Sequence, residues 1–502
     1  MPDQSGGPIS PKLPRRRRLE LPLVAALLAI TALATYWPVL ESEYLFADDY
    51  PQFCDRQEFA VHAPYGRPVL GAMFLLLPEK PHDLAPFTRL RAFSLCGAVL
   101  FGVLLWGVVL RRILPVFAAG LAALACVLLP PFHFYAAAST AYPIVWTACL
   151  ALGAGGLASR AFLPSRPLRI DATACLAGIA LLLEIAALSA YQPAAMCFWL
   201  ALIPALVDAR FVDCPVWRKR TFAVALLGLS SMLIYFAAFK IAGFSGLINA
   251  PARVGLTMDP IGKLLWFVQK PLVRAASLWG VYEWRYVIAA GAIAVIAAAA
   301  IRAWRDIPAG QSRGAFFKAT GLAALPVLAY APVLAVAEDW PSYRSLLPLT
   351  IVVGTFVALA AWRLSEHLRP GAKLVVGAAA VAIVAAAGFS ARHNVADNIV
   401  AVQRAELDYL LAHLKTLDPN DLRAIHVVMS HYSRGPEFPA KSDEFGIRSA
   451  SRPRWTVDMV RCGLRLLGKP EPSAITCSPA LESAPTAAEV LVVDMNAIRW
   501  TR

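Results

Sequence analysis

Apolar runs long enough to cross a lipid bilayer recur along most of this 502-residue chain. The first, residues 21–40, has about the 20 residues that a helix needs to span ~30 Å of hydrocarbon. Hydrophobic residues make up 58% of the chain and charged residues only 16%, and the mean hydropathy is +0.58. This pattern is not that of a soluble domain. It predicts a mainly α-helical, polytopic transmembrane bundle.

Eleven membrane spans are predicted from these runs. They cover residues 21–40, 88–110, 113–130, 143–159, 171–190, 193–209, 221–243, 285–301, 319–337, 344–362 and 373–390. If they cross the membrane alternately, every connection on the side of the N-terminus is basic. The residues concerned are Lys12, Arg15–Arg18, Arg111, Arg112, Arg160, Arg166, Arg169, Arg210, Arg218, Lys219, Arg220, Arg302, Arg305, Arg313, Lys318, Arg363, Arg369 and Lys373. Because basic loops stay on the cytoplasmic side, the N-terminus is expected in the cytoplasm.

The net charge of +14 comes largely from these short clusters between apolar runs. Charge in that pattern sets membrane topology and does not build a nucleic-acid-binding surface. We therefore expect membrane lipid among the partners, and no nucleic acid.

The predicted topology divides the chain into three parts. Residues 1–20 are expected to be a disordered, basic cytoplasmic N-terminus, and residues 21–390 the transmembrane domain, with outside loops at 41–87 and 244–284. Residues 391–502 lose the membrane pattern and show a helical period followed by short apolar runs at 425–429 and 490–493. Such runs are typical of buried strands. This tail is predicted to be a small extracytoplasmic α/β domain.

Two adjacent carboxylates, Asp48 and Asp49, follow the first span where the chain leaves the membrane on the outside. Acidic residues at that depth lose solvation energy, so they are candidates for a functional site. A carboxylate within reach of a hydroxyl can accept its proton as a general base. One of the pair could instead hold an arginine or a divalent cation, the only cofactor that we expect. Successive side chains in an extended loop point to opposite sides, which disfavours joint action on one target.

Cationic residues of the outside segments are candidates for binding a phosphate group. They are Arg67, Lys270, Arg274 and Arg344. Lys270 and Arg274 are one helical turn apart, and Arg344 begins a span, where facing lipid would be costly. Polar residues at a span end and in the turn before Arg344 are candidates for binding a sugar or an acceptor. They are Tyr191, Gln192, Glu338 and Asp339.

Other motifs are absent from the sequence or leave their meaning open. The chain has no Walker loop, no glycine-rich dinucleotide motif, no Gly-x-Ser-x-Gly elbow and no zinc-spaced cysteine pair, so nucleotide-driven chemistry is disfavoured. A disulfide between Cys462 and Cys477 is plausible if the tail faces an oxidising compartment. Glu184 lies inside span 171–190 and should face protein or pair with a cation.

Three motifs resemble those of a known class. The carboxylate pair Asp48 and Asp49, in the first outside loop after the first span, resembles that of GT-C membrane glycosyltransferases. More narrowly, the Phe-Ala-Asp-Asp motif at 46–49 followed by the Gly-Arg-Pro motif at 66–68 resembles the bacterial glucosyltransferases that decorate O-antigen, the lipopolysaccharide glycan, and related surface glycans of the cell envelope. The Ser-Ala-Tyr-Gln motif at 189–192 is similar to another feature of that group.

The resemblance implies a GT-C-like bundle in the bacterial inner membrane. It implies a polyprenyl-phosphate sugar as donor and transfer of a hexose, glucose above all, to a glycan or lipid-linked acceptor outside the cytoplasmic membrane. Asp48 or Asp49 would then be the catalytic base.

Two other functions remain open. A carrier or flippase for lipid-linked sugars favours repeated halves and ionisable groups in mid-membrane, but the sequence has no obvious internal repeat. A glycan polymerase or ligase with a lipid-diphosphate donor favours a large basic outside loop, which 244–284 partly supplies. Such an enzyme has no particular need of the aspartate pair.

Overall fold

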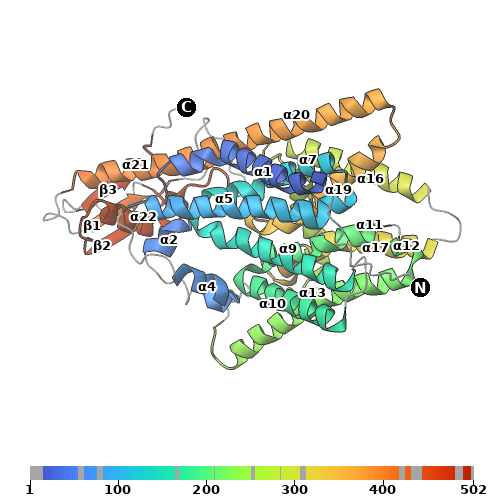
Figure 1. Cartoon of the computed structure of the whole chain (residues 1–502). Helices are drawn as coiled ribbons and strands as arrows, with labels where there is room; N and C mark the ends of the chain where they lie inside the picture. Colours follow the sequence, from blue (N-terminus) through green and yellow to red (C-terminus); the bar gives the residue numbers. More distant parts are fainter. Residues whose placement is uncertain are drawn as a thin grey trace, which may run out of the picture.

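The computed structural model describes residues 15–54, 62–75, 83–163, 169–208, 210–249, 255–282, 284–305, 312–417, 424–430, 444–480 and 490–498. An elongated bundle of helices carries a small sheet at one end, which we call the sheet end (Figure 1). Helix α1 begins at Arg15, so the predicted disordered segment 1–20 overlaps a helix, and its first 14 residues lie outside the described ranges.

The helices begin where the sequence places proline or a turn. Pro215 and Pro370 open α13 and α20, and proline suits this position because the first turn of a helix needs no N–H donor. The main helices are α1 (Arg15–Glu41), α2 (Asp49–Cys54), α4 (Pro68–Leu75), α5 (Ala85–Leu105), α7 (Val116–Val127), α8 (Pro130–Ala137), α9 (Tyr142–Phe162), α10 (Ile170–Ala195), α11 (Ile203–Val207), α13 (Pro215–Phe244), α14 (Pro260–Phe267), α15 (Val273–Ala276), α16 (Arg285–Arg305), α17 (Ser312–Leu328), α18 (Ala331–Ala335), α19 (Tyr343–Ser365), α20 (Pro370–Val395), α21 (Ala401–Lys415) and α22 (Pro453–Leu466). Short helices α6 (Arg111–Ile113) and α12 (Arg210–Asp213) lie between them.

Within the described ranges, eight helices are long and apolar enough to cross a membrane, or nine if the bent pair α7 and α8 forms one span. The chain is therefore a multi-pass membrane protein. Two differences from the eleven predicted spans are local. The run 319–337 is divided between α17 and α18. The runs 171–190 and 193–209 form one helical stretch, Ile170–Val207.

The Ile170–Val207 stretch reverses its direction at Tyr191. The backbone is extended there, with φ −155° and ψ 99°, and both halves pack against α9. Gln192 contacts Gly66 just before α4, whereas the Val207 carbonyl accepts a hydrogen bond from Lys318 in α17. The two apolar runs of the sequence correspond to these two antiparallel halves.

The C-terminal part begins without a break from the bundle. Helix α20 continues through a π-helical turn into α21, so Pro370–Lys415 is one stretch of 46 residues. The predicted domain boundary at 390/391 lies inside it. Three parallel strands follow, β1 (Ala424–Val428), β2 (Ala474–Ser478) and β3 (Val490–Asp494), in the order β2-β1-β3. Strands β1 and β3 match the two predicted strands, whereas β2 was not predicted.

The C-terminal part shares a hydrophobic core with the first loop. Helix α2 packs against α22, and one buried cluster joins the two regions. Its members include Leu45, Tyr50, Leu84 and Phe87 from the first loop region and Leu407, Leu410, Met459 and Val460 from the C-terminal part. Because burial of apolar surface drives association, this core holds the C-terminal part on the bundle.

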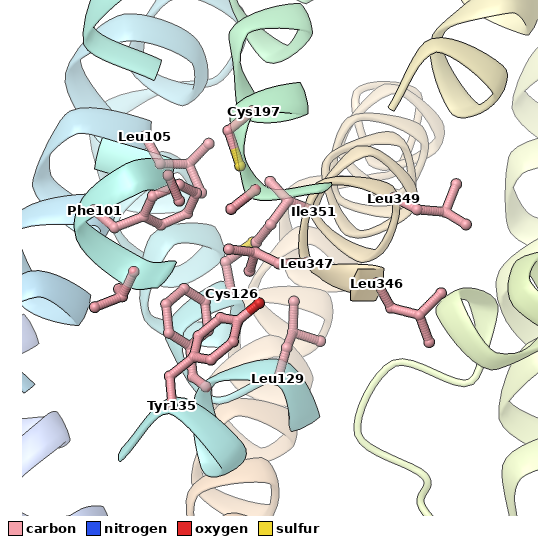
Figure 2. Packing of buried hydrophobic residues seen from close by; sticks show 14 of the residues in the cluster. Phe101, Leu105, Cys126, Leu129, Tyr135, Cys197, Leu346, Leu347, Leu349 and Ile351 are labelled. Carbon is pink, nitrogen blue, oxygen red and sulfur yellow. The ribbon is translucent and has the colours of Figure 1, made fainter. Parts of the chain in front are cut away.

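The main core of the bundle packs around the first turns of α19. Phe101 of α5, Leu129 and Tyr135 of the α7–α8 segment, and Leu347 of α19 gather there (Figure 2). The Tyr135 hydroxyl donates a hydrogen bond of 2.7 Å to the carbonyl of Arg344. A polar group at the edge of the core thereby fixes the first turn of α19, which carries the cationic side chain of Arg344.

The predicted pairing of Cys462 with Cys477 is wrong. Cys477 has a free thiol, whereas Cys462 is disulfide-bonded, so Cys477 is not its partner. Cys477 lies in β2, and its sulfur contacts the Pro453 carbonyl at 3.9 Å instead.

Candidate active site

A cavity of about 970 Å³ is bordered by the first loop, the α10 reversal, α13, the α18–α19 segment and the C-terminal part. Its lining combines two kinds of residue. The charged and titratable ones include Asp48, His62, Arg67, Arg274, Glu338, Arg344, Glu444, Arg452 and Arg454. The apolar ones include Leu188, Met232, Leu233, Phe236, Phe239, Leu256, Val333 and Val336. Ligand sites in proteins commonly have this composition, an apolar lining with a few polar groups that fix orientation.

A strained turn presents Asp48 to the cavity. Ala47 has a φ of +25°, a left-handed conformation that costs free energy for a residue with a Cβ. The Ala47 N–H donates to the Ser449 hydroxyl at 2.9 Å, and the Asp49 N–H donates to the Phe46 carbonyl at 2.6 Å. These bonds hold the turn, and one of them comes from the C-terminal part.

Asp48 forms an ion pair with Arg344, 296 residues away. Arg344 Nη1 lies 2.7 Å from Asp48 Oδ2, and Arg344 Nε lies 3.2 Å from Glu444 Oε1. The side chains of Asp48 and Arg344 keep 31% and 24% of their exposure, whereas that of Glu444 keeps 2%. One arginine is thus shared by a cavity carboxylate and a buried carboxylate.

Asp49 points away from the cavity. It is fully buried, and its two oxygens accept hydrogen bonds from the backbone N–H groups of Phe46, Ser139 and Thr140 at 3.0, 3.2 and 2.8 Å. Burial raises the pKa of Asp49 above its ordinary value of 3.8, although Arg91 and the backbone donors oppose this shift. Only one of the two predicted catalytic carboxylates therefore reaches the cavity.

Arg91 of α5 orders the chain just before the turn. Its buried guanidinium donates to the carbonyls of Val39, Ser42 and Tyr44 and to the Ser139 hydroxyl, and it stacks on the Tyr44 ring. A buried arginine needs such partners because its donors cannot reach water. It was not among the predicted residues.

The Gly66-Arg67 turn is clamped from two helices. Gln192 Nε2 and the Tyr235 hydroxyl donate to the Gly66 carbonyl at 3.0 and 2.8 Å. Arg67 Nε donates to Gln192 Oε1 at 3.0 Å, and its guanidinium lies 4.6 Å from the centre of the Tyr191 ring. The structure therefore brings three predicted residues, Arg67, Tyr191 and Gln192, to one wall of the cavity.

The predicted pair of Lys270 and Arg274 is separated. Arg274 lines the cavity and donates to the Pro341 carbonyl at 2.5 Å, whereas Lys270 is exposed and is not a lining residue. A π-helical turn over Val268–Leu272 changes the helical phase between them. Arg274 is the member of the pair with access to a cavity ligand.

The predicted pair of Glu338 and Asp339 is also divided. Glu338 lines the cavity, and its carbonyl accepts a hydrogen bond of 2.7 Å from Lys263. Asp339 is not a lining residue and forms a salt bridge of 2.7 Å with the same lysine. Lys263 thus binds both residues of the predicted pair, and Asp339 is engaged in this salt bridge outside the cavity lining.

His62 is a histidine of the cavity lining. Burial, together with the positive charge of Arg67, lowers the pKa of His62 to about 4 from its ordinary 6.5. The imidazole is therefore neutral at physiological pH and adds no charge to the cavity there.

The described residues contain no group of three histidine, cysteine or acidic side chains placed to hold a metal ion. Asp48, the cavity member of the predicted metal pair, has an arginine as its cation partner.

The C-terminal part supplies lining residues that sequence reasoning missed. Glu444, Arg452, Arg454 and Trp455 belong to it, and the Arg452 guanidinium lies 4.4 Å from the centre of the Trp455 ring. No motif or spacing marks them. The only available signal was compositional, because a basic and aromatic Arg-Pro-Arg-Trp segment opens α22.

Comparisons with known proteins give little further information. No family model and no curated sequence matches the chain. A crystal structure of ArnT from Cupriavidus metallidurans bound to undecaprenyl phosphate aligns with 12% identity and a TM-score of 0.45, over 90% of this chain and 89% of that one. At this level the similarity assigns neither fold nor function.

Proposed function

We propose that this protein is a GT-C-type glycosyltransferase of the bacterial inner membrane. It transfers a hexose, glucose above all, from a polyprenyl-phosphate donor to a surface glycan or lipid-linked acceptor at the outer face. The observation that carries the proposal is a single cavity whose lining combines charged residues with apolar ones. The Asp48–Arg344 pair suits a sugar and its phosphate, and the apolar residues of α13 and α18 suit a lipid chain.

The reaction needs one base and one stabilised leaving group. The acceptor hydroxyl oxygen attacks the anomeric carbon, and its proton passes to Asp48. The bond from that carbon to the donor phosphate oxygen breaks, and its electron pair stays on the phosphate. Arg67, Arg274 and Arg344 line the cavity and can stabilise the growing negative charge.

The assignment separates the two aspartates. Asp48 is the proposed base, because it is the partly exposed carboxylate in the cavity. We assign Asp49 a structural role, because its carboxylate accepts hydrogen bonds from three backbone N–H groups. Tyr191, Gln192 and Glu338 remain candidates for contacts with the sugar or the acceptor.

The test uses Asp48→Asn in membranes that contain normal amounts of protein. Transfer is measured from radiolabelled polyprenyl-phosphate glucose to the envelope glycan of a strain that lacks the gene. We expect a loss of roughly 10²–10⁴-fold. Asp339→Asn is the matched control, because this aspartate lies near the same cavity without lining it.

Mass analysis of the surface glycan distinguishes the other functions. A single missing hexose in the deletion strain supports the transferase, and Asp48→Asn should reproduce it. Unchanged glycan with lipid-linked sugar accumulated in the cytoplasmic leaflet would favour a carrier. A loss of whole repeat units would favour a polymerase or ligase. Full activity of Asp48→Asn would remove Asp48 from the reaction.

A further inference from the structure

Glu444 occupies an unusual position for a carboxylate. It belongs to the C-terminal part of the chain, its side chain is 2% exposed, and it borders the cavity through its contact with Arg344. Its oxygens accept hydrogen bonds from the Ser342 hydroxyl and, at 3.2 Å, from the Tyr343 N–H. Glu444 is therefore held by the residues that begin α19.

Hydrogen bonds along its edge and aromatic rings near its faces hold the guanidinium of Arg344 in place. Nε faces Glu444 at 3.2 Å, and Nη1 faces Asp48 at 2.7 Å. The Phe134 and Trp340 rings lie 4.8 and 5.8 Å from the guanidinium carbon. Because a guanidinium is planar and its donors form a rigid fork, the Nε bond decides where the Nη groups point.

We propose that Glu444 is a positioning residue for the transfer reaction, acting through Arg344 to set the orientation of Asp48 and the charge that surrounds it. The proposal rests on the proposed function, in which Asp48 accepts the acceptor proton. Glu444 does not touch the reacting atoms. Through it, the C-terminal part completes the active site of the membrane domain.

Charge sharing is the physical basis. A carboxylate paired with an arginine of its own is a poor base, because the positive charge stabilises its ionised form. Here a second carboxylate, Glu444, lies beside the same guanidinium, and its negative charge offsets part of the stabilisation that Arg344 gives to a neighbouring carboxylate. Without Glu444, this opposing charge is lost, and the Nη groups lose their fixed direction. Both changes slow proton transfer to Asp48.

Several other charged and titratable groups lie near Asp48. His62 and Tyr191 interact electrostatically with it, and Arg67 faces both of them. Glu338, Arg274, Arg452 and Arg454 line the same cavity, and Asp49 is adjacent in the chain. Since the pKa of His62 is about 4, it does not change its charge above pH 5. A change in the pH dependence of the rate above that pH therefore does not come from His62.

The experiment compares Glu444→Gln with the unmodified full-length protein in lipid nanodiscs. Transfer from polyprenyl-phosphate glucose to the purified acceptor glycan is followed between pH 5 and 8. We expect kcat to fall roughly 10-fold, since a small displacement at the reacting groups is costly. We also expect the acid limb of kcat/KM to move about half a unit to lower pH, because one negative charge fewer surrounds Asp48. Glu444→Asp, which keeps the charge, should restore the position of the limb.

Asp458→Asn is the matched control. Asp458 is a buried carboxylate of the same C-terminal part, and it pairs with Arg461 of the same helix at 3.4 Å. Its substitution should leave the acid limb of the pH profile in place, even if the rate falls with the amount of folded protein. An equal shift in this control, or an unshifted limb in Glu444→Gln, would overturn the proposal. Failure of the proposed function looks different, because the unmodified protein would then transfer no sugar.

Discussion

The first loop has two sides that differ in almost every physical respect. On the cavity side, Asp48 is partly exposed and has an arginine partner that a ligand can reach. On the inner side, Asp49 is fully buried and surrounded by backbone donors. Asp48 and Asp49 are thus adjacent and identical in type, yet their surroundings differ. The comparison teaches that the surroundings of a carboxylate, and not its place in a motif, decide whether it is available for chemistry.

The strongest test of this comparison is the same substitution on both sides. Asp49→Asn places an amide NH₂ among N–H donors in a buried site, and we expect a loss of about 3 kcal/mol of folding free energy. Asp48→Asn removes a partly exposed ion pair and should cost less than about 1 kcal/mol. The measurement is the melting temperature of purified protein in detergent, alongside transfer activity.

The opposite pattern would break the comparison. If Asp48→Asn unfolded the protein while Asp49→Asn stayed folded and inactive, Asp49 would be the better candidate for the base. An equal loss of stability in both variants would mean that the two sides are not distinct.

The same contrast shows how far the sequence could predict the site. Alternation of side chains along the loop suggested that the two aspartates point to different sides, and the structure places Asp48 at the cavity and Asp49 in the interior. The sequence could not tell which one faces the cavity, because that depends on Ala47, whose strained turn is held by Ser449 from the far end of the chain.

The predicted cations had mixed outcomes for a physical reason. Arg67 and Arg344 reach the cavity because a turn and a helix start fix them locally. Lys270 was expected to share a face with Arg274, but the π-helical turn between them breaks the α-helical period on which that expectation depends. Such a turn has no reliable signature in the sequence.

The C-terminal part was predicted as a separate domain, and its contribution to the cavity was missed. Its strands at 424–428 and 490–494 were recognisable from their apolar residues. Glu444 lies in a polar stretch without period, and its partner Arg344 is 100 residues away in the sequence. A contact of that range follows from the shared core around α2 and α22, which only the folded chain defines.

Lowering the pH should have opposite effects on the stability contributions of His62, on the cavity side, and of Asp49, on the inner side. The pKa of His62 is lowered to about 4, so its contribution to stability is complete above pH 6.5 and is lost as the pH falls toward 4. At pH 5 the loss is about 2 kcal/mol relative to pH 7.5. Asp49 has the opposite sign: its raised pKa means that protonation is easier in the folded state, and acid removes a cost.

Melting temperatures between pH 4.5 and 7.5 measure this balance. His62→Gln should flatten the profile between pH 6.5 and 5, and Asp49→Asn should steepen the loss of stability at the acid end. A profile that does not respond to the His62 substitution would show that the imidazole is protonated in the folded protein without cost.

The smallest expected effect concerns the turn that carries Arg67. Gly66 has a φ of +74°, and a Cβ added there would collide with the Tyr235 hydroxyl and lie 3.2 Å from Gln192 Nε2. Gly66→Ala should therefore cost roughly 1–2 kcal/mol, in part from the backbone and in part from the collision. It should also displace Arg67 and raise the KM for the polyprenyl-phosphate donor.

Gly246→Ala separates these two causes. Gly246 also has a φ of +74°, but nothing lies within 4 Å of its added Cβ, so this variant carries the backbone strain alone. The difference in melting temperature between the two variants measures the collision with Tyr235. If both variants melt alike and keep the same KM, the clamp formed by Gln192 and Tyr235 does not position Arg67. The cavity side would then depend on the Asp48–Arg344 pair without support from the Gly66 turn.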